Sequence, residues 1–296
     1  MKKKTLVYFL PLALFLTFSF TIYFSFIKRT KGFCVKKIIS SHPYYSLWDI
    51  GPPTPEQITL LDHLSTQSFY LFGSGAQCYA FVSEDGDYVI KFFKQKHMCV
   101  KSLVDLLPLP FPLKSMRNEK INRRLFLRKK SFSNFRFAYE NFQEETGLLF
   151  LHLNPTKYLK KKILFYDLHG KSFRLDLDKM EFVIQKRVEL LLPKIKHLMT
   201  KGKTEKAKTL ITSILDHLEK RSIQGIGDND SNCKNNLGVL KKNIITLDVG
   251  QLYPMPPRPI TNEEYLFATK DLQKWLDQSY PDLGIFLRTQ LQMRKK

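Results

Sequence analysis

Cysteine is scarce in this chain of 296 residues. The four cysteines have neither C-x-x-C spacing nor a paired histidine pattern, which argues against a zinc site and against a disulfide scaffold. A reducing compartment fits this usage best. They are Cys34, Cys78, Cys99 and Cys233.

Acidic residues are also few, with 27 Asp and Glu against 48 Lys and Arg, so the formal net charge is +21. That charge favours an anionic partner such as membrane headgroups, nucleic acid or a phosphorylated substrate. A genome that favours lysine and phenylalanine explains it equally well, and nucleic acid is not expected as a partner. With 43% hydrophobic residues the chain can bury one substantial core or two lobes, which excludes a disordered protein.

Charge is absent from one long segment near the N-terminus. After "MKKK" come 23 uncharged residues, "TLVYFLPLALFLTFSFTIYFSFI", followed by "KRTKG". At about 1.5 Å rise per residue this length spans the roughly 30 Å of a bilayer core, which predicts a transmembrane anchor over residues 1–27. A cleaved secretory signal is the alternative, but it would have a shorter apolar region and a small-residue cleavage site.

Basic residues flank the predicted anchor on both sides. Three lysines precede it, and five basic residues follow it in the connector 28–53. The larger count after the segment indicates a single-pass membrane protein whose C-terminal domain is cytoplasmic.

Local patterns predict one helix and then a group of strands. Thr54, Pro55 and Gln57 form a capping-box arrangement that opens a helix. The aromatic and β-branched runs of 68–93 predict three strands separated by a Gly loop and the turn "EDGD".

The middle of the chain gives mixed signals. Residues 94–130 are predicted to be irregular, because the prolines of "LPLPFPL" forbid a continuous helix. The segment "RNEKINRRLFLRKK" is basic at seven of fourteen positions. It is either a surface that binds phosphate or lipid headgroups or a solvated face. A helix is predicted over 131–153, and two hairpin-like segments over 162–188. Beyond them we expect a helix over 203–221, a strand pair in 237–249 and two closing helices.

Two aspartates and four asparagines crowd into "GIGDNDSNCKNN", residues 225–236. The spacing of Asp228, Asp230 and Asn232 matches the start of an EF-hand calcium loop. Cys233 then replaces the required glycine and Val239 the bidentate glutamate, so calcium is not the better interpretation.

The second interpretation uses the next segment as well. Asp230 precedes Asn235 by five residues, and Asp248 opens "DVG" 18 residues after Asp230, with a predicted strand pair between. In these residues the sequence resembles the protein-kinase-like superfamily. The resemblance implies that Asp230 is the catalytic aspartate and that Asn235 and Asp248 hold Mg²⁺ for phosphoryl transfer from ATP.

The resemblance extends upstream. Gly73 and Gly75 stand where a Gly-rich nucleotide loop is expected, and Lys91 follows on the third predicted strand as the phosphate-binding lysine. A helical glutamate should pair with Lys91. Glu145 is favoured because Leu148 and Leu149 would anchor its face, and Glu140 and Glu144 are the alternatives.

Several residues depart from the family pattern. Cys78 replaces the third glycine of the loop, and Asp228 and Asn229 replace the His and Arg before the catalytic aspartate. Asp228 is therefore an alternative to Asp230 as the base. No "APE" follows Gly250, beyond which 46 residues remain, so a platform for protein substrates is not expected.

We therefore expect an α+β, two-lobed protein-kinase-like fold. It would comprise a transmembrane anchor (1–27), a basic linker (28–53), a β-rich N-lobe (54–187) and a small α-rich C-lobe (188–296). The implied function is a membrane-anchored phosphotransferase that uses ATP and Mg²⁺ on a small molecule, glycan or lipid. The alternatives are a catalytically inactive kinase-like scaffold and a basic membrane-bound adaptor without nucleotide.

Overall fold

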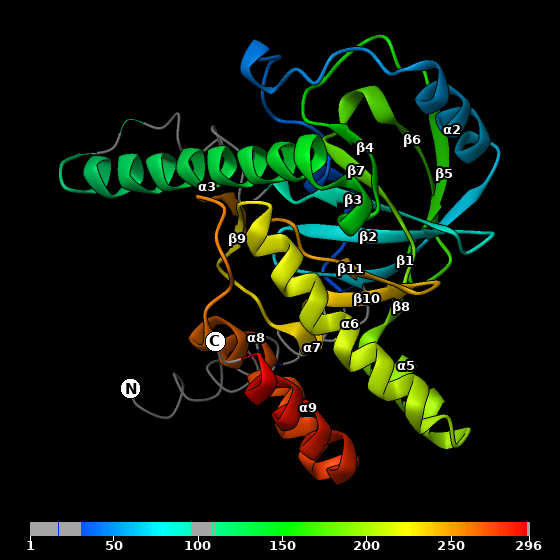
Figure 1. The fold of residues 1–296 in the computed structure, drawn as a ribbon. Coiled ribbons are helices and arrows are strands. Elements are labelled where there is room, and N and C mark those ends of the chain that lie inside the picture. The colour runs from blue at the N-terminus through cyan, green and yellow to red at the C-terminus, as the bar shows by residue number, and fades with distance from the viewer. Residues whose placement is uncertain (1–16, 18–30, 96–107, 109, 295–296) are drawn as a thin grey trace, which may run out of the picture.

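The computed structural model describes residue 17, residues 31–95, residue 108 and residues 110–294 (Figure 1). The predicted transmembrane anchor lies, apart from Thr17, outside the described residues. Within the described part of the chain, no helix combines the length and the apolar character needed to cross a membrane.

A helix over Pro55–Ser65 (α2) begins as the sequence predicts. Thr54 accepts a hydrogen bond from the Gln57 amide, and the Gln57 side chain accepts one from the Thr54 amide, which completes the capping box. The buried residues of the helix, Leu61 and Leu64, join the core of the large sheet.

Seven strands form one large sheet. They are β1 (Ser68–Ser74), β2 (Cys78–Ser83), β3 (Tyr88–Phe93), β4 (Leu148–His152), β5 (Lys162–Tyr166), β6 (Ser172–Asp176) and β7 (Phe182–Lys186). Their order is β4-β7-β3-β2-β1-β5-β6, and all neighbours are antiparallel except β1 and β5. The three strands predicted in 68–93 are thus confirmed in position, and so is the hairpin of β5 and β6. The second hairpin-like segment, 178–188, instead holds the strand β7, which pairs with β3 and β4.

Phenylalanine rings fill one face of this sheet. Phe81, Phe92 and Phe165 contact one another edge to face with ring centroids 5.1–5.7 Å apart, and none of them is exposed. Alternation of such rings with less buried residues, as in β2, is what fixes the register, because a shift by one residue would expose the whole apolar set.

The helix between β3 and β4 differs from the prediction. It is α3 (Leu113–Asn141), followed by a short α4 (Gln143–Thr146). It begins 18 residues earlier than expected because the prolines end at Pro112, after which no residue breaks a helix. It does not continue to residue 153, because Gly147 takes a left-handed conformation and Leu148 enters β4.

The remainder of the chain is mainly helical. Its elements are β8 (Glu189–Leu190), α5 (Leu191–Thr200), α6 (Thr204–Ile223), β9 (Ile226–Asp228), α7 (Cys233–Asn236), β10 (Leu237–Leu240), β11 (Asn243–Thr246), β12 (Leu252–Pro254), α8 (Asn262–Ser279) and α9 (Pro281–Met293). Short 3-10 turns over Val35–Lys37, Ser46–Trp48 and Leu177–Lys179 complete the described structure.

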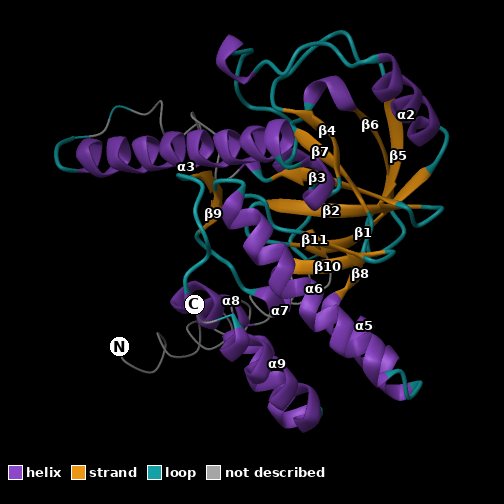
Figure 2. Ribbon diagram, viewed as in Figure 1, coloured by secondary structure: helices purple, strands orange, loops and turns teal. Residues whose placement is uncertain are grey.

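The predicted strand pair is confirmed, since β10 and β11 pair antiparallel from Leu237 opposite Thr246 to Leu240 opposite Asn243. The helices α5, α6, α8 and α9 lie on the other side of this pair from the large sheet (Figure 2). They enclose a second core, whose centre includes Ile211, Leu272 and Leu287. The α+β class is confirmed, and the predicted lobe boundary after residue 187 falls between β7 and β8.

Candidate functional site

The peptide of Leu247 joins three of the predicted site segments. Its carbonyl oxygen accepts a hydrogen bond from the Lys91 ammonium at 2.8 Å, and its N–H donates to the Asn236 carbonyl oxygen at 2.8 Å. Lys91 is on β3, Asn236 ends the Asp/Asn-rich loop, and Leu247 immediately precedes Asp248. The fold therefore brings the lysine, the loop and the Asp-Val-Gly segment together.

The surroundings of Lys91 are partly buried. Burial lowers the pKa of its ammonium, and the neighbouring Cys78 and Asp248 side chains oppose that shift. Burial also raises the pKa of the Cys78 thiol to about 12, so this thiol is neutral near pH 7. Asp248 is therefore the anionic group that favours a charged Lys91.

The Gly-rich loop lies between β1 and β2. The Gly75 amide bonds to the Cys78 carbonyl oxygen at 3.0 Å, and the Lys94 ammonium donates to the Ser74 hydroxyl at 2.9 Å and to the Gly75 carbonyl oxygen. Lys94 is 8% exposed. Sequence analysis missed this lysine, and its only signal was a charged residue directly after an apolar strand.

The same loop contacts the Asp-Val-Gly segment through Gln77. A Cβ atom on Gly250 would lie 2.5 Å from Gln77 Oε1, so this close approach requires glycine. Gln77 Oε1 also accepts from the Ser131 hydroxyl at 2.9 Å, and Asn134 Nδ2 donates to the Gly250 carbonyl oxygen at 2.8 Å. Two polar residues of α3 thus hold the loop against the segment.

Asp230 is exposed, and hydrogen bonds of its backbone N–H and carbonyl groups fix its position. Its N–H donates to Asp228 Oδ1 at 2.9 Å, and its carbonyl oxygen accepts from Asn236 Nδ2 at 2.7 Å. In the part of the chain that the structure describes, the Asp230 carboxylate has no hydrogen-bond partner of its own. It is therefore available to a substrate hydroxyl.

Asp228 has a different environment. Its side chain is 3% exposed and forms an ion pair with Arg221 at 2.8 Å, and its other oxygen accepts the Asp230 amide. Burial raises the pKa of Asp228, while the Arg221 guanidinium and the hydrogen bonds oppose it. Both carboxylate oxygens of Asp228 already accept hydrogen bonds, one from Arg221 and one from the Asp230 amide. Asp228 therefore stabilises the loop conformation and is the weaker candidate for the catalytic base.

The two predicted metal ligands are both exposed. Asn235 lies in α7, and one Asp248 oxygen accepts from the Gly250 amide at 3.0 Å. An amide and a carboxylate oxygen suit Mg²⁺, which completes its shell with water and phosphate oxygens. Among the described residues, no three His, Cys, Asp or Glu side chains converge as a metal site by themselves.

The predicted pairing of Lys91 with Glu145 is wrong. Glu145 forms an ion pair with Lys220 at 2.6 Å. Partial burial raises the pKa of Glu145, but its hydrogen bonds and the Lys220 charge together outweigh burial and lower it. Glu140 pairs with Arg136 and Glu144 is exposed, so neither alternative reaches the lysine. The cause is the end of α3 at Phe142, after which α4 packs against β11 and Glu145 reaches Lys220 of α6.

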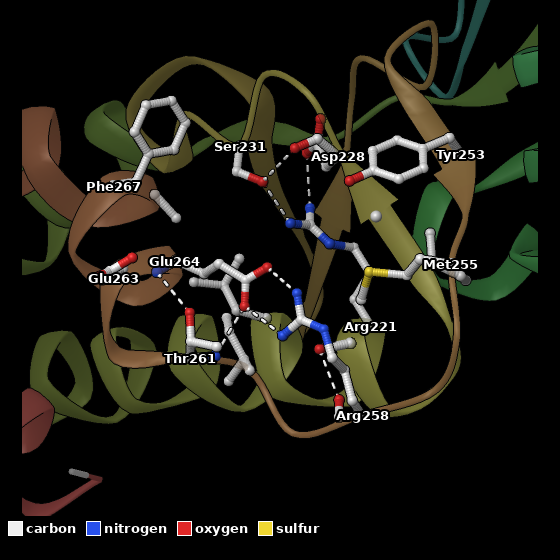
Figure 3. Close-up of a pocket in the computed structure, with 16 residues that line it drawn as sticks. Arg221, Asp228, Ser231, Tyr253, Met255, Arg258, Thr261, Glu263, Glu264 and Phe267 are labelled. Atoms are coloured by element: carbon white, nitrogen blue, oxygen red, sulfur yellow. Dashed lines mark hydrogen bonds and ion pairs between the residues drawn. The ribbon is translucent and has the colours of Figure 1, made fainter.

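A cavity of about 410 Å³ adjoins the Asp230 loop (Figure 3). Asp228 and Ser231, which flank Asp230, are part of its lining, together with residues of α6, β12 and α8. Arg221 donates to Ser231 Oγ at 2.6 Å as well as to Asp228. The cavity lining next to the Asp230 loop is therefore a connected network of polar side chains.

The lysine on β3, the Gly-rich turn beside it, and the Asp-Val-Gly segment that follows the Asp/Asn loop and a strand pair make this a protein-kinase-like fold. Solved structures with a similar fold include the bifunctional kinase-methyltransferase WbdD, at 15% identity and a TM-score of 0.33, which covers 73% of this chain and 42% of that one. Another is the complex of Rv3197 with erythromycin from Mycobacterium tuberculosis, at 14% identity and a TM-score of 0.33, which covers 80% of this chain and 60% of that one.

The chain thus spans less than two thirds of either solved protein. No protein-family model matches the sequence, and no curated protein matches it. The role of each residue therefore depends on its own contacts in this chain.

Proposed function

We propose that this protein transfers the γ-phosphoryl group of ATP to an alcohol with the help of Mg²⁺. The observation that carries the proposal is the Leu247 peptide, which is bonded on one side to Lys91 and on the other to the loop of Asp230. This connection supports a single site in which Lys91 would bind phosphate, Asn235 and Asp248 would hold Mg²⁺ and Asp230 would act on the acceptor.

Each residue has a distinct role in the proposed reaction. Lys91 binds the α- and β-phosphates, and the Gly73–Gly75 turn lets the backbone approach them closely. Asn235 and Asp248 would hold Mg²⁺, which when bound neutralises charge on the phosphates. Asp230 orients the acceptor hydroxyl and takes its proton while the hydroxyl oxygen bonds to the γ-phosphorus and the bond to the ADP oxygen breaks.

A second candidate function is nucleotide binding without turnover. It is favoured by the environment of Lys91, since the face of α3 that meets the site carries Ser131 and Asn134, and Glu145 pairs elsewhere. A lysine with Asp248 as its nearby carboxylate can still bind phosphate, but it is less firmly oriented than one with a helical glutamate.

We further propose that residues 1–27 anchor the protein, with the domain in the cytoplasm where ATP is available. The N-terminal half of α3 extends beyond the large sheet (Figure 1), where it is basic and exposes Met116 and Phe126, at 54% and 65%. Such a surface suits contact with anionic headgroups near the anchor. Protease accessibility in sealed vesicles tests the orientation, and cleavage of the domain only from the lumenal side would contradict it.

The decisive experiment uses the full chain in detergent micelles. ATP should raise the unfolding temperature, and Mg²⁺ should increase that effect, because a ligand that binds only the folded state stabilises it. Phosphate transfer from labelled ATP to a panel of alcohols then separates the two candidate functions. Stabilisation without transfer to any acceptor would favour the inactive protein, and no stabilisation at all would contradict both.

A further inference from the structure

The cavity beside the Asp230 loop has a lining that indicates what it binds. It lies between the end of α6, β9, β12 and the start of α8, and its volume of about 410 Å³ falls within the range of small-molecule pockets. Its lining includes two aromatic rings, Phe267 and Tyr253, and two ion pairs (Figure 3).

The charges in the lining compensate one another. Arg221 pairs with Asp228 at 2.8 Å, and Arg258 binds both oxygens of Glu264 at 2.6 and 2.8 Å. With Glu263 the lining holds three carboxylates against two guanidinium groups, in a chain whose net charge is +21. An anionic ligand would find both guanidinium groups already neutralised and would meet the carboxylates, which is unfavourable.

Two aromatic rings face each other across the cavity. Phe267 and Tyr253 lie on opposite sides of it in Figure 3, and they are 66% and 37% exposed. The Tyr253 ring lies directly over Gly227, where a Cβ atom would come within 2.6 Å of Tyr253 Cε2. Glycine therefore makes room for the ring, which shows that its position is built into the fold.

Hydrogen-bonding groups remain available at the rim. Within residues 31–95 and 110–294, neither the Tyr253 hydroxyl nor the Glu263 carboxylate has a hydrogen-bond partner. A purely apolar ligand would leave the Tyr253 hydroxyl and the Glu263 carboxylate without water or a partner, which is costly. A ligand with both hydroxyl groups and an apolar face would satisfy the whole lining.

We propose that this cavity binds a neutral, polyhydroxylated ring of the size of a hexopyranose. The apolar face of the ring packs against Phe267, and its hydroxyl groups bond to Tyr253 and Glu263. Binding of the ring does not require nucleotide. Its identity as the phosphoryl acceptor rests on the proposed function, because Asp228 and Ser231 in the lining flank Asp230.

Saturation-transfer NMR on the full chain in micelles, without ATP, tests the binding. The probes are methyl glucopyranoside, methyl mannopyranoside, methyl galactopyranoside and, as the anionic arm, glucose 6-phosphate. At least one neutral glycoside should show transfer, and Phe267→Ala should weaken its binding by about tenfold, the upper range for one aromatic contact. Tyr253→Phe, which removes only the hydroxyl, should weaken it several-fold, roughly what one neutral hydrogen bond contributes.

Phe126 provides a matched control, since it is 65% exposed and lies on α3, outside the cavity. Phe126→Ala should leave glycoside binding unchanged. Three results would overturn the proposal. They are the absence of saturation transfer to every glycoside, a loss of glycoside binding in Phe126→Ala equal to that in Phe267→Ala, and tighter binding of glucose 6-phosphate than of the neutral sugars. Glycoside binding by a chain that does not bind ATP would support this site while contradicting the proposed phosphotransferase.

Discussion

The Lys91 ammonium donates a 2.8 Å hydrogen bond to the carbonyl oxygen of Leu247, a residue 156 positions later in the chain. This bond connects the large sheet to the residue that precedes Asp248. It also occupies the lysine in the absence of a glutamate partner, and phosphate oxygens would compete with the carbonyl for it.

Lys91 and Glu145 should respond differently to substitution. Lys91→Ala should weaken ATP binding by about 10- to 100-fold, because it removes charged hydrogen bonds to the phosphates. Glu145→Gln should leave ATP binding unchanged, since Glu145 pairs with Lys220. Titration with a fluorescent ATP analogue measures both, and loss of binding in Glu145→Gln would restore the pairing expected from the sequence.

Asp248 should carry the magnesium dependence. In Asp248→Ala, ATP alone should still raise the unfolding temperature, but addition of Mg²⁺ should give no further increase. The exposed Asp282 at the start of α9 serves as the control, and Asp282→Ala should behave as the unaltered protein. An intact Mg²⁺ effect in Asp248→Ala would remove this residue from the metal site.

Substitution of Asp230 should affect phosphoryl transfer, whereas substitution of Asp228 should affect the stability of the fold. Asp230→Asn should fold and bind ATP but lose phosphoryl transfer by roughly 10²- to 10⁴-fold, because the carboxylate acts mainly in the transition state. Asp228→Asn should instead destabilise the fold by about 3–5 kcal/mol, since it leaves Arg221 buried without its partner. Urea unfolding and single-turnover transfer measure the two effects. A stable but inactive Asp228→Asn beside an active Asp230→Asn would reverse the assignment.

Gly250 and Gln77 should show a coupled effect on stability. Gly250→Ala places a Cβ atom 2.5 Å from Gln77 Oε1 and should cost about 1–3 kcal/mol, as overpacking does. In the background of Gln77→Ala the same substitution should cost much less, because the clashing atom is gone. Urea unfolding of the four proteins gives the coupling, and additive costs would contradict the contact.

His217 should make the fold sensitive to acid. Burial lowers its pKa to about 4, with Arg221 adding to the shift, and its Nε2 lies 2.9 Å from Thr246 Oγ1. In the unfolded chain His217 therefore becomes protonated below about pH 6.5, whereas in the folded chain it becomes protonated only near pH 4. Stability should fall as the pH drops through this window, by roughly 3 kcal/mol from this residue alone.

The contribution of His217 is isolated by difference. Urea unfolding of His217→Gln between pH 7 and pH 4 should show a shallower loss than the unaltered protein. His197 is exposed, and His197→Gln should keep the full pH dependence. The same slope in all three proteins would mean that His217 is not the group that titrates.

Much of the strand structure followed from the sequence because its signals are local. The runs in 68–93 alternate buried phenylalanines with other residues, and "LGVL" with "IITL" forms a hairpin whose pairing is set by a short turn. The prediction of a site at Asp230, Asn235 and Asp248 rests on their spacing along the chain. Their separations are short, so the strand pair between them constrains their distances.

The helix α3 and the strand β4 were less predictable. Leu148–His152 reads as the apolar end of a helix, and only pairing with β7 makes it a strand. The basic run of α3 carries no apolar stripe to predict a helix, yet the helix forms because its second half packs Phe132, Phe135 and Ala138 into the core.

The sequence by itself supplied the residue types on which the proposed chemistry rests, namely oxygen ligands, a lysine on a strand and a glycine turn. The tertiary structure alone decided which charges meet. Glu145 binds Lys220, Asp228 binds Arg221, and Lys91 binds a carbonyl group, since a long side chain can reach several partners and only packing selects one. The cavity beside Asp230 has the same origin, because it exists only where α6, β9, β12 and α8 pack together.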